Sequence, residues 1–422
     1  MYKAPRGTHD TLPPAQPAWR WVETKAEALC QLYGYERLDT PVFEDAGLFV
    51  RTIGEGPDIV EKEMYTFNDR GGKLMTLKPE GTAAVCRAYL EHGLYNSPQP
   101  VKLYYFSSLF RYERPQAGRY RQHHQFGCEA LGDNDPTLDA ELIEIAWRLL
   151  TSLGLNRLNL ELNSIGCKAC RPGYKEKLQH YYSAHSAQLC PDCLRRLNQN
   201  PLRLLDCKQA SCQTVADAAP SSLESLCNEC QRHFQLLTHY LELVGVPFNL
   251  NHRLVRGLDY YTRTVFEIQP ANGGAQSTLC GGGRYDDLIQ ELGGQPTPGV
   301  GFAAGIERII QQLQDQAAVI PPLPQPQVFI AALGDEARDQ ALSLANSWRQ
   351  KGVGVFIAPA GKSLKAQLRQ AHARGIPWTA ILGEEEMGKK TIRLRHMLRG
   401  EEQEIPWSQI DDWLHQLDSP GL

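Results

Sequence analysis

Hydrophobic and polar positions change their period repeatedly along the first 166 residues. Apolar residues at helical spacing end at Gly34, and alternating apolar and polar residues follow in short runs that are typical of strands. The Gly71-Gly72 pair between two such runs indicates a hairpin turn. The pattern predicts, in chain order, helix 18–33, strand 35–41, strands 64–67 and 73–77, helix 83–92, strands 101–106 and 124–131, helix 136–153 and strand 158–163.

Two later changes of pattern divide the rest of the chain. Residues 167–245 are polar and helical in period, and strand patterns resume at Phe248 and over 264–268, which suggests an inserted helical subdomain. A proline-rich linker follows within residues 321–327. Beyond it, strands and helices alternate, which predicts a small parallel or mixed α/β domain with strand 328–333, helix 335–350, strand 353–358, helix 364–374 and strand 378–382.

Composition narrows the class of protein. The 422 residues suggest two or three domains, and 42% hydrophobic with 22% charged residues is typical of a globular protein. No apolar run approaches the roughly 18 residues of a membrane span, and the first residues lack an apolar signal core, so we expect a cytoplasmic location. The net charge of −4 does not indicate a nucleic-acid binder, although a local basic groove remains open.

Eight of the twelve cysteines form four close pairs within residues 167–230. In a reducing compartment such spacing favours zinc over disulfides, because thiolates two residues apart can both reach one tetrahedral ion. The alternative is a set of reduced, unliganded thiols. The candidate ligands of one or two structural zinc ions are Cys167, Cys170, Cys190, Cys193, Cys207, Cys212, Cys227 and Cys230; the unpaired Cys30, Cys86, Cys128 and Cys280 are interpreted as core residues.

The stretch from Phe110 to Gln122 carries four arginines in a loop that is broken by Pro115 and Gly118. It follows the predicted strand 101–106. Guanidinium groups bind phosphate oxygens in pairs, so arginines at a strand end suit a polyphosphate or a nucleic acid. A salt-bridged surface hairpin is the alternative on these residues alone.

Other segments favour the phosphate-binding interpretation over the surface hairpin. Thr76–Thr82, Phe110–Glu113, Gly281–Asp286 and Gly299–Arg308 resemble the motifs of class II aminoacyl-tRNA synthetases. Arg256-Gly257-Leu258-Asp259-Tyr260-Tyr261 and the opening Pro5–Asp10 resemble the histidyl-tRNA synthetases, bacterial type. The resemblance covers essentially the whole chain, in the family's order.

The resemblance implies an α+β fold, in which a class II antiparallel sheet is flanked by helices. The expected parts are a catalytic domain (1–166 and 246–320), an inserted cysteine-rich helical subdomain (167–245), a linker (321–327) and a C-terminal α/β anticodon-binding domain (328–422). The first helix and strand are expected at the interface of a homodimer. Many relatives lack cysteines in the insertion, so any zinc there is structural, and its loss is expected to impair tRNA charging more than histidine activation.

The implied activity is ATP-dependent attachment of L-histidine to tRNA(His) through histidyl-adenylate, with release of AMP and pyrophosphate. ATP is expected to bind as its Mg²⁺ complex. A carboxylate nucleophile is already ionised at neutral pH, so the first step needs positioning and cations rather than a general base.

The resemblance assigns roles to individual residues. Those expected to be catalytic are Arg256, Arg111 and Arg308. Those expected to bind histidine are Glu80, Thr82, Gln125, Glu129, Tyr260, Tyr261 and Tyr285. Those expected to bind ATP are Arg111, Glu113, Arg119 and Arg308, and those expected to contact tRNA are Gln116 and Arg121. The chain departs from the family pattern at Lys78, at Ser107-Ser108 and at His123, where a phenylalanine is usual.

Three alternatives stay open. One is a synthetase-like regulatory subunit of ATP phosphoribosyltransferase, but such proteins lack the C-terminal domain and lose the catalytic arginines. Another is a zinc-organised RNA-binding module, which would not explain the histidine-pocket pattern. The third concerns the basic residues Lys389, Lys390, Arg393, Arg395 and Arg399, which are either an anticodon-stem contact or a solvated charged face.

Overall fold

The computed structural model describes residues 2–53, 63–115, 118–272 and 278–417. Contacts divide the chain into two compact units, Met1–Pro321 and Pro322–Leu422. Among the described helices, none is long and apolar enough to cross a membrane.

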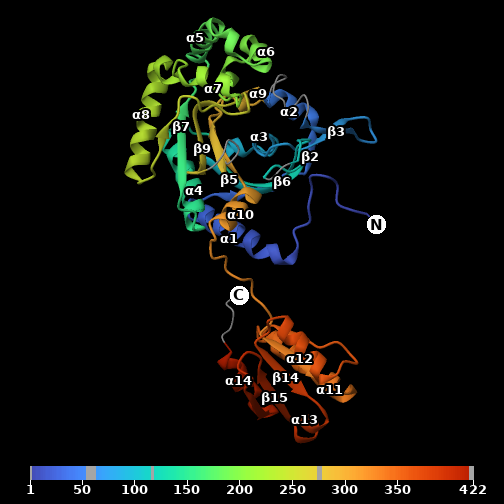
Figure 1. Cartoon of the computed structure of the whole chain (residues 1–422). Helices are drawn as coiled ribbons and strands as arrows, with labels where there is room; N and C mark the ends of the chain where they lie inside the picture. The colour runs from blue at the N-terminus through green and yellow to red at the C-terminus, as the bar shows by residue number, and fades with distance from the viewer. Residues whose placement is uncertain (1, 54–62, 116–117, 273–277, 418–422) are drawn as a thin grey trace. The chain divides into compact units, whose positions relative to one another are not determined.

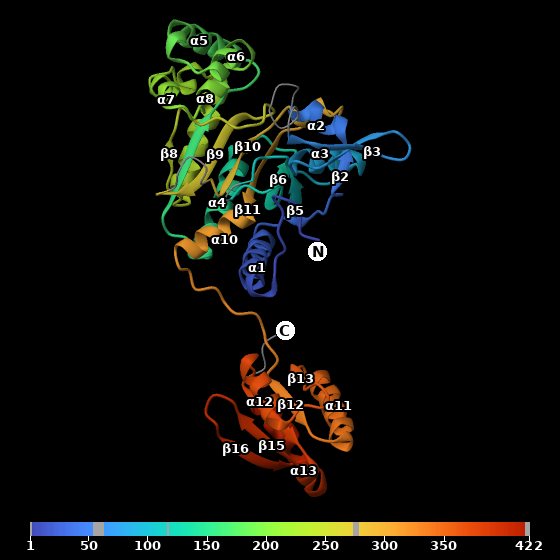
Figure 2. The same ribbon diagram turned by 45° about the vertical axis from the view of Figure 1, so that its right-hand side comes forward.

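The larger unit is built on an eight-stranded sheet in the order β1-β5-β6-β11-β10-β9-β7-β8 (Figures 1 and 2). Its pairs are antiparallel except β1 with β5 and β7 with β8. The strands are β1 (Glu36–Arg37), β5 (Val101–Phe110), β6 (Gln122–Leu131), β7 (Leu158–Ser164), β8 (Asn249–Leu250), β9 (Thr262–Pro270), β10 (Cys280–Arg284) and β11 (Gly299–Gly305). The expected α+β architecture is confirmed.

Alternation along β5 separates the two faces of this sheet. Tyr104 packs in one hydrophobic core with α1 (Gln16–Leu32), α4 (Pro136–Ser152) and α10 (Ile306–Asp315). Leu103 and Tyr105 belong to a second core on the opposite face, with α3 (Thr82–Glu91) and α9 (Leu288–Glu291). The predicted active-site tyrosines Tyr260, Tyr261 and Tyr285 lie in this second core.

A three-stranded sheet, β2-β4-β3, lies beside the large sheet and contains the predicted hairpin. Its strands are β2 (Phe43–Asp45), β3 (Tyr65–Asn68) and β4 (Leu74–Leu77), and α2 (Ala46–Ile53) follows β2. The predicted strand 35–41 is mostly wrong, because only the two residues of β1 pair with β5. The chain then leaves the large sheet and enters the small one.

The insertion contains α5 (Arg171–Ala184), α6 (Pro191–Gln199), α7 (Ala210–Asp217) and α8 (Asn228–Leu243), joined by short 3₁₀ turns. Figures 1 and 2 both show these helices gathered beyond the β7–β9 side of the sheet. The buried side chains of α5 to α7, among them Tyr174, Leu178 and Tyr182, join the second core, whereas the buried Phe234 and Leu237 of α8 join the first. The insertion is therefore packed against the larger unit rather than tethered by a linker.

The smaller unit is a mixed sheet in the order β13-β12-β14-β15-β16. Its strands are β12 (Val328–Ala332), β13 (Val355–Ile357), β14 (Trp378–Leu382), β15 (Thr391–His396) and β16 (Glu402–Pro406), and its helices are α11 (Asp335–Gln350), α12 (Leu364–Ala373), α13 (Glu384–Lys389) and α14 (Ile410–Gln416). The alternating strands and helices are confirmed. Strands β15 and β16 were not predicted, although Ile392 and Leu394 alternate with polar residues along β15.

Candidate active site

A cavity of about 970 Å³ opens on the second-core face of the large sheet. The residue that follows β5, the start of β6, β10, the end of β11 and the start of α10 all contribute to its walls. Five residues expected to be catalytic or to bind ATP line it: Arg111, Glu113, Arg119, Arg256 and Arg308; Gln125 lines it as well. Residues remote in sequence thus converge on one space.

Arg111 and Arg308 are oriented by backbone carbonyl groups. The Nε atom of Arg111 donates to the carbonyl oxygen of Pro79 at 2.9 Å. Arg308 donates from Nε to the carbonyl oxygen of Gly118 at 3.1 Å and from Nη1 to that of Thr278 at 2.9 Å. A carbonyl fixes a guanidinium without cancelling its charge, so both side chains are held in place and keep their charge for a ligand.

Arg256 is held differently. Its Nη1 atom forms an ion pair with Oε1 of Glu267 on β9, and Oε2 of Glu267 accepts a hydrogen bond from Thr278 Oγ1 at 2.9 Å. Its guanidinium lies so close to β10 that a Cβ atom at Gly281 would be 2.7 Å from Nη1. Glycine at 281 is therefore needed for this guanidinium to lie flat against the strand, beside the Tyr261 ring at 5.9 Å.

Two residues of the cavity wall, His123 and Arg308, have lowered pKa values. Burial, then the Arg111 and Arg308 cations, lower the pKa of His123 to about 3, so this imidazole is neutral at physiological pH. Burial, then the Arg119 cation, lower the pKa of Arg308, with Arg111 acting in the same direction. Cations this close together without full compensation favour a multiply charged anion between them.

Behind the cavity, Glu129 is the centre of a buried polar cluster. Thr82 Oγ1 donates to its Oε1 at 2.7 Å, Tyr105 donates to the same oxygen at 3.4 Å, and Tyr285 donates to Oε2. Burial raises the pKa of Glu129 to about 8 against these hydrogen bonds. A Cβ at Gly301, its partner across the β6–β11 pair, would lie 1.7 Å from Oε2, so glycine is required there as well.

The remaining predicted histidine-binding residues surround this cluster. Glu80 accepts hydrogen bonds from the backbone N–H groups of Thr82 and Ala83, at 2.7 and 2.8 Å, and so caps the first turn of α3. The Tyr260 and Tyr261 rings are 4.8 Å apart, and Tyr260 meets Tyr285 edge-on at 5.9 Å. All these side chains are buried. The structure thus brings six of the seven predicted residues into one cluster, and places Gln125 in the cavity wall.

The residues predicted to contact tRNA are less well defined. Arg121 donates to the Glu113 carbonyl oxygen at 3.3 Å, and its guanidinium stacks 3.9 Å from the centre of the Tyr112 ring. Arg119 pairs with Glu113 at 3.0 Å. Gln116 lies outside the described residues.

Several residues of the site have no signal in the sequence that we recognised. Glu267 and Thr278, which hold Arg256 and Arg308, follow ordinary strand and loop patterns. His123 stands where the family pattern usually has phenylalanine, and that substitution by itself does not indicate a site residue. Arg203, Cys207 and Lys208 of the insertion line the same cavity as the arginines, although their segment matches none of the active-site motifs.

In the smaller unit, four of the five basic residues considered for an anticodon-stem contact lie within ion-pair distance of carboxylates. Lys389 contacts Glu385 at 2.6 Å, Arg393 contacts Glu386 at 2.6 Å and Arg395 contacts Glu402 at 2.7 Å. Arg399 is 4.0 Å from Glu401. This pairing favours the solvated charged face over an anticodon-stem contact.

An antiparallel sheet with an arginine loop between its two longest strands, beside a cation-lined cavity, defines a class II aminoacyl-tRNA synthetase. Residues 7–309 match the family described as Histidyl-tRNA synthetase, and residues 327–417 match an Anticodon binding domain. The chain belongs to the histidyl-tRNA synthetase family.

Curated relatives and solved structures agree with this assignment. A Dehalococcoides mccartyi protein named Histidine--tRNA ligase is 58% identical over 410 residues, which are 97% of this chain and 98% of that protein. One from Caldanaerobacter subterraneus is 48% identical, covering 97% and 99%. The crystal structure of apo S. aureus histidyl-tRNA synthetase is 36% identical, covers 98% of this chain and all of that one, and has a TM-score of 0.83.

The regulatory-subunit alternative is also represented by a fold neighbour. A Bacillus halodurans protein described as an ATP phosphoribosyltransferase regulatory subunit/histidyl-tRNA synthetase has a TM-score of 0.65 at 22% identity. At that identity the likeness concerns the fold alone. Arg111, Arg256 and Arg308 and the match to an anticodon-binding domain separate this chain from a purely regulatory subunit.

Proposed function

We propose that the protein joins L-histidine to tRNA(His) in two steps, through histidyl-adenylate. The histidine carboxylate attacks the α-phosphorus of ATP and pyrophosphate leaves; the terminal ribose hydroxyl of tRNA then attacks the adenylate carbonyl carbon and AMP leaves. ATP enters as its complex with a divalent cation, Mg²⁺. The observation that carries this proposal is the cavity in which Arg111 and Arg308 are oriented by carbonyl oxygens.

In this proposal the three arginines contact different parts of the ATP triphosphate. Arg111 contacts the α-phosphate and the histidine carboxylate, Arg308 contacts the γ-phosphate, and Arg256 lies across the α-phosphate. Charge that moves onto the phosphate oxygens in the transition state is then stabilised by cations that need no rearrangement. The Arg119–Glu113 pair supports the proposed role of both residues in bracketing the nucleotide.

Histidine binds, in this proposal, against the buried cluster of Glu129, Thr82 and the three tyrosines, with Glu80 and Gln125 near its amino group. Both imidazole nitrogens need polar partners, and the hydroxyl and carboxyl groups of the cluster supply them. A site built of such groups rejects an apolar analogue by roughly 10⁴-fold, because its own polar groups would be left unpaired.

For tRNA we propose that Gln116 and Arg121 contact the acceptor end, and that residues 328–422 form the anticodon-binding domain after the linker at 321–327. Residues 1–166 and 246–320 would form the catalytic domain, interrupted by the insertion at 167–245. The ion pairs of β15 argue that the anticodon contact uses another face of the smaller unit.

The proposal includes a homodimer in the cytoplasm. The small sheet β2-β4-β3 supports the dimer, because Phe43 and Phe67, which lie on the same face of the two strands flanking β4, are 54% and 43% exposed. An apolar surface of this kind suits a second copy. The insertion would carry structural zinc on its eight paired cysteines.

Histidine-dependent ATP–pyrophosphate exchange, followed by charging of tRNA(His), tests the function. Exchange and charging that both require histidine are expected. A regulatory subunit would bind histidine without exchange, and an RNA-binding module would bind tRNA with neither activity; either result would contradict the proposal.

A further inference from the structure

The fold sorts the eight paired cysteines into two separate sets of four. Cys167, Cys170, Cys227 and Cys230 form the first cluster, and Cys190, Cys193, Cys207 and Cys212 form the second. Within each cluster the sulfur atoms all lie within 4.8 Å of one another. The sequence spacing does not predict this pairing, because the first cluster joins the outermost pairs and encloses the second.

The distances between sulfurs match one tetrahedral ion per cluster. Cys167 Sγ is 3.8 Å from both Cys170 Sγ and Cys227 Sγ, Cys170 is 3.9 Å from Cys230, and Cys190 is 3.9 Å from Cys207. Zinc–sulfur bonds of about 2.3 Å at tetrahedral angles place sulfurs about 3.8 Å apart, whereas a disulfide needs about 2.05 Å. A multi-iron cluster would spread the thiolates farther.

Backbone groups around the clusters also suit thiolate ligands. The N–H group of Cys167 donates to Cys170 Sγ at 3.3 Å, and that of Cys190 donates to Cys212 Sγ at 3.2 Å. Such hydrogen bonds commonly orient metal-bound thiolates. By contrast, Cys30 and Cys128 form a close pair at 3.6 Å in the first core, where neither belongs to a four-cysteine group among the described residues.

The first cluster ties the start of α5, where the chain has just left β7, to the start of α8, the last helix of the insertion. Arg171, next to Cys170, donates to the carbonyl oxygen of Tyr261 at 2.6 Å. Lys168 pairs with Asp287 at 3.1 Å. Residues beside this cluster therefore contact the Tyr261 end of the segment 253–263.

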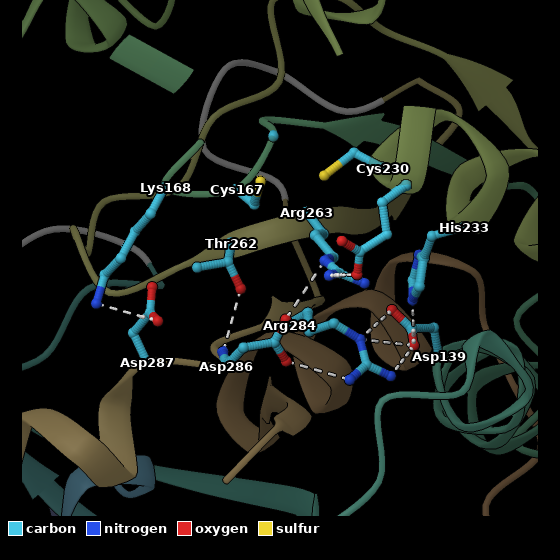
Figure 3. Close-up of polar contacts among 12 residues, drawn as sticks. Asp139, Cys167, Lys168, Cys230, His233, Thr262, Arg263, Arg284, Asp286 and Asp287 are labelled. Atoms are coloured by element: carbon cyan, nitrogen blue, oxygen red, sulfur yellow. Dashed lines mark hydrogen bonds and ion pairs between the residues drawn. The ribbon is translucent and has the colours of Figure 1, made fainter. Parts of the chain in front are cut away.

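Figure 3 shows how the first cluster connects to the interior of the sheet. Glu229, between Cys227 and Cys230, pairs with Arg263, and Arg263 lies 3.6 Å from Asp286. Asp286 pairs with the fully buried Arg284, which in turn binds Asp139 on α4. The cluster is thereby joined to the centre of the catalytic unit through ion pairs.

The second cluster shapes residues 200–208, which hold the other end of the same segment. Asn200 donates to Asp259 at 2.8 Å, Arg203 Nη1 donates to the Arg256 carbonyl oxygen at 3.1 Å, and Arg253 donates to the Leu205 carbonyl oxygen at 3.4 Å. This stretch contains one 3₁₀ turn, Pro201–Leu204, followed by Cys207, and only short helices flank it. Leu202, Leu204 and Leu205 pack this stretch into the second core, and Cys207 ties its end to the second cluster.

We infer that the chain binds two structural zinc ions, one in each cluster, and that together they position the Arg253–Arg263 segment of the active site. The second centre positions Arg256 and the first positions Tyr261. This inference rests on the proposed roles of Arg256 and Tyr261, but the metal content does not. It reverses the order expected from the sequence: histidine activation should fall at least as much as tRNA charging when a centre is lost.

Elemental analysis of protein purified with reductant and without chelator tests the metal content. Two zinc equivalents per chain are expected. Cys227→Ser and Cys190→Ser should each leave one, the double variant none, and the control Cys30→Ala two. Less than about a tenth of an equivalent, iron in place of zinc, or loss of both ions in a single variant would overturn the two-centre assignment.

Pyrophosphate exchange tests the positioning. Cys190→Ser should lower kcat on the order of tenfold to a hundredfold, because Arg256 acts in the transition state, whereas Cys227→Ser should mainly raise the KM for histidine. Arg203→Ala should lower kcat while keeping two zinc equivalents, and Arg203→Lys should restore it in part. Unchanged kcat in both Cys190→Ser and Arg203→Ala would refute the positioning role.

Two measurements keep this test informative if a cysteine variant fails to fold. Arg203→Ala leaves both clusters intact, so its exchange rate tests by itself whether the contact between Arg203 and Arg256 positions Arg256. In the unaltered protein, slow removal of zinc by a chelator should proceed in two phases, with exchange falling during them. Full exchange after both ions have left would overturn the inference, whereas no exchange before chelation would count against the proposed function instead.

Discussion

Arginines lie both in the cation-lined cavity and on strand β15 of the smaller unit, but their charges have different partners in the two places. In the cavity, Arg111 and Arg308 are held by carbonyl oxygens, and burial, then the neighbouring cations, lower the pKa of His123 and of Arg308. On β15, Arg393 and Arg395 are each within 2.7 Å of a glutamate oxygen. The partner of an arginine, rather than its presence, therefore decides whether charge is left for a ligand.

Arg256 and Arg393 make the comparison sharper, because each has a glutamate partner. Arg256 pairs with Glu267 at the cavity, and Arg393 pairs with Glu386, which caps α13 through the Gly383 N–H group. Only Arg256 also faces an open, cation-rich space. An equivalent truncation at the two positions should thus separate a catalytic cation from a structural one.

The largest effect is expected for Arg256→Ala. Histidine-dependent pyrophosphate exchange should fall on the order of a hundredfold or more, because a preorganised cation at the α-phosphate is lost. Circular dichroism should show an unchanged fold, and Arg393→Ala is the matched control with exchange near the parent value. Exchange within about threefold of the parent in Arg256→Ala would contradict the proposed mechanism.

Removal of the smaller unit tests whether that unit binds tRNA. A chain that ends at Pro321, the boundary between the two compact units, should form adenylate at the parent rate. Its KM for tRNA should rise roughly a hundredfold, because two linked binding sites become one. Charging kinetics with saturating histidine and ATP measure this, and equal KM values for both chains would remove the anticodon role.

A smaller effect is expected from Glu129, a carboxyl group buried without a cation. Its pKa is about 8 in the folded chain against 4.5 ordinarily, so the folded state binds more protons between these values. The free energy of unfolding should therefore decrease as pH rises from 4.5 to 8, by at most about 1.4 kcal/mol per pH unit.

Glu129→Gln tests that dependence, because the amide fills the same space and does not titrate. Thermal midpoints measured across this pH range should fall less steeply in the variant than in the parent. Burial also raises the pKa of Glu80, which should leave part of the slope in place. Identical slopes would show that Glu129 does not carry the predicted proton.

The smallest effect is expected for Arg395→Ala on β15. Its partner Glu402 is 36% exposed, and exposed pairs contribute only about 0.2–1 kcal/mol to stability. Charging of tRNA(His) should stay within about twofold of the parent. A tenfold loss of charging, with exchange unchanged, would restore the anticodon-stem interpretation of this strand.

The sequence alone determined the family, the α+β class and most elements of the catalytic unit. Motifs such as Arg256–Tyr261 depend on short-range order, and helical or alternating periods survive wherever one face of an element is buried. The Gly71-Gly72 hairpin and the long helix at 136–153 were foreseen for this reason. Four isolated cysteines were correctly assigned to the core.

Only the tertiary structure decided which side chains meet. Glu267 and Glu402 are similar charged residues in strands, yet one holds Arg256 at the cavity and the other neutralises Arg395 on a solvated face. The pairing of Cys167 with Cys227, and the approach of Arg203 to Arg256, join positions more than 50 residues apart. Local sequence patterns do not predict such contacts, because the contacts form only when elements that are distant in sequence pack together.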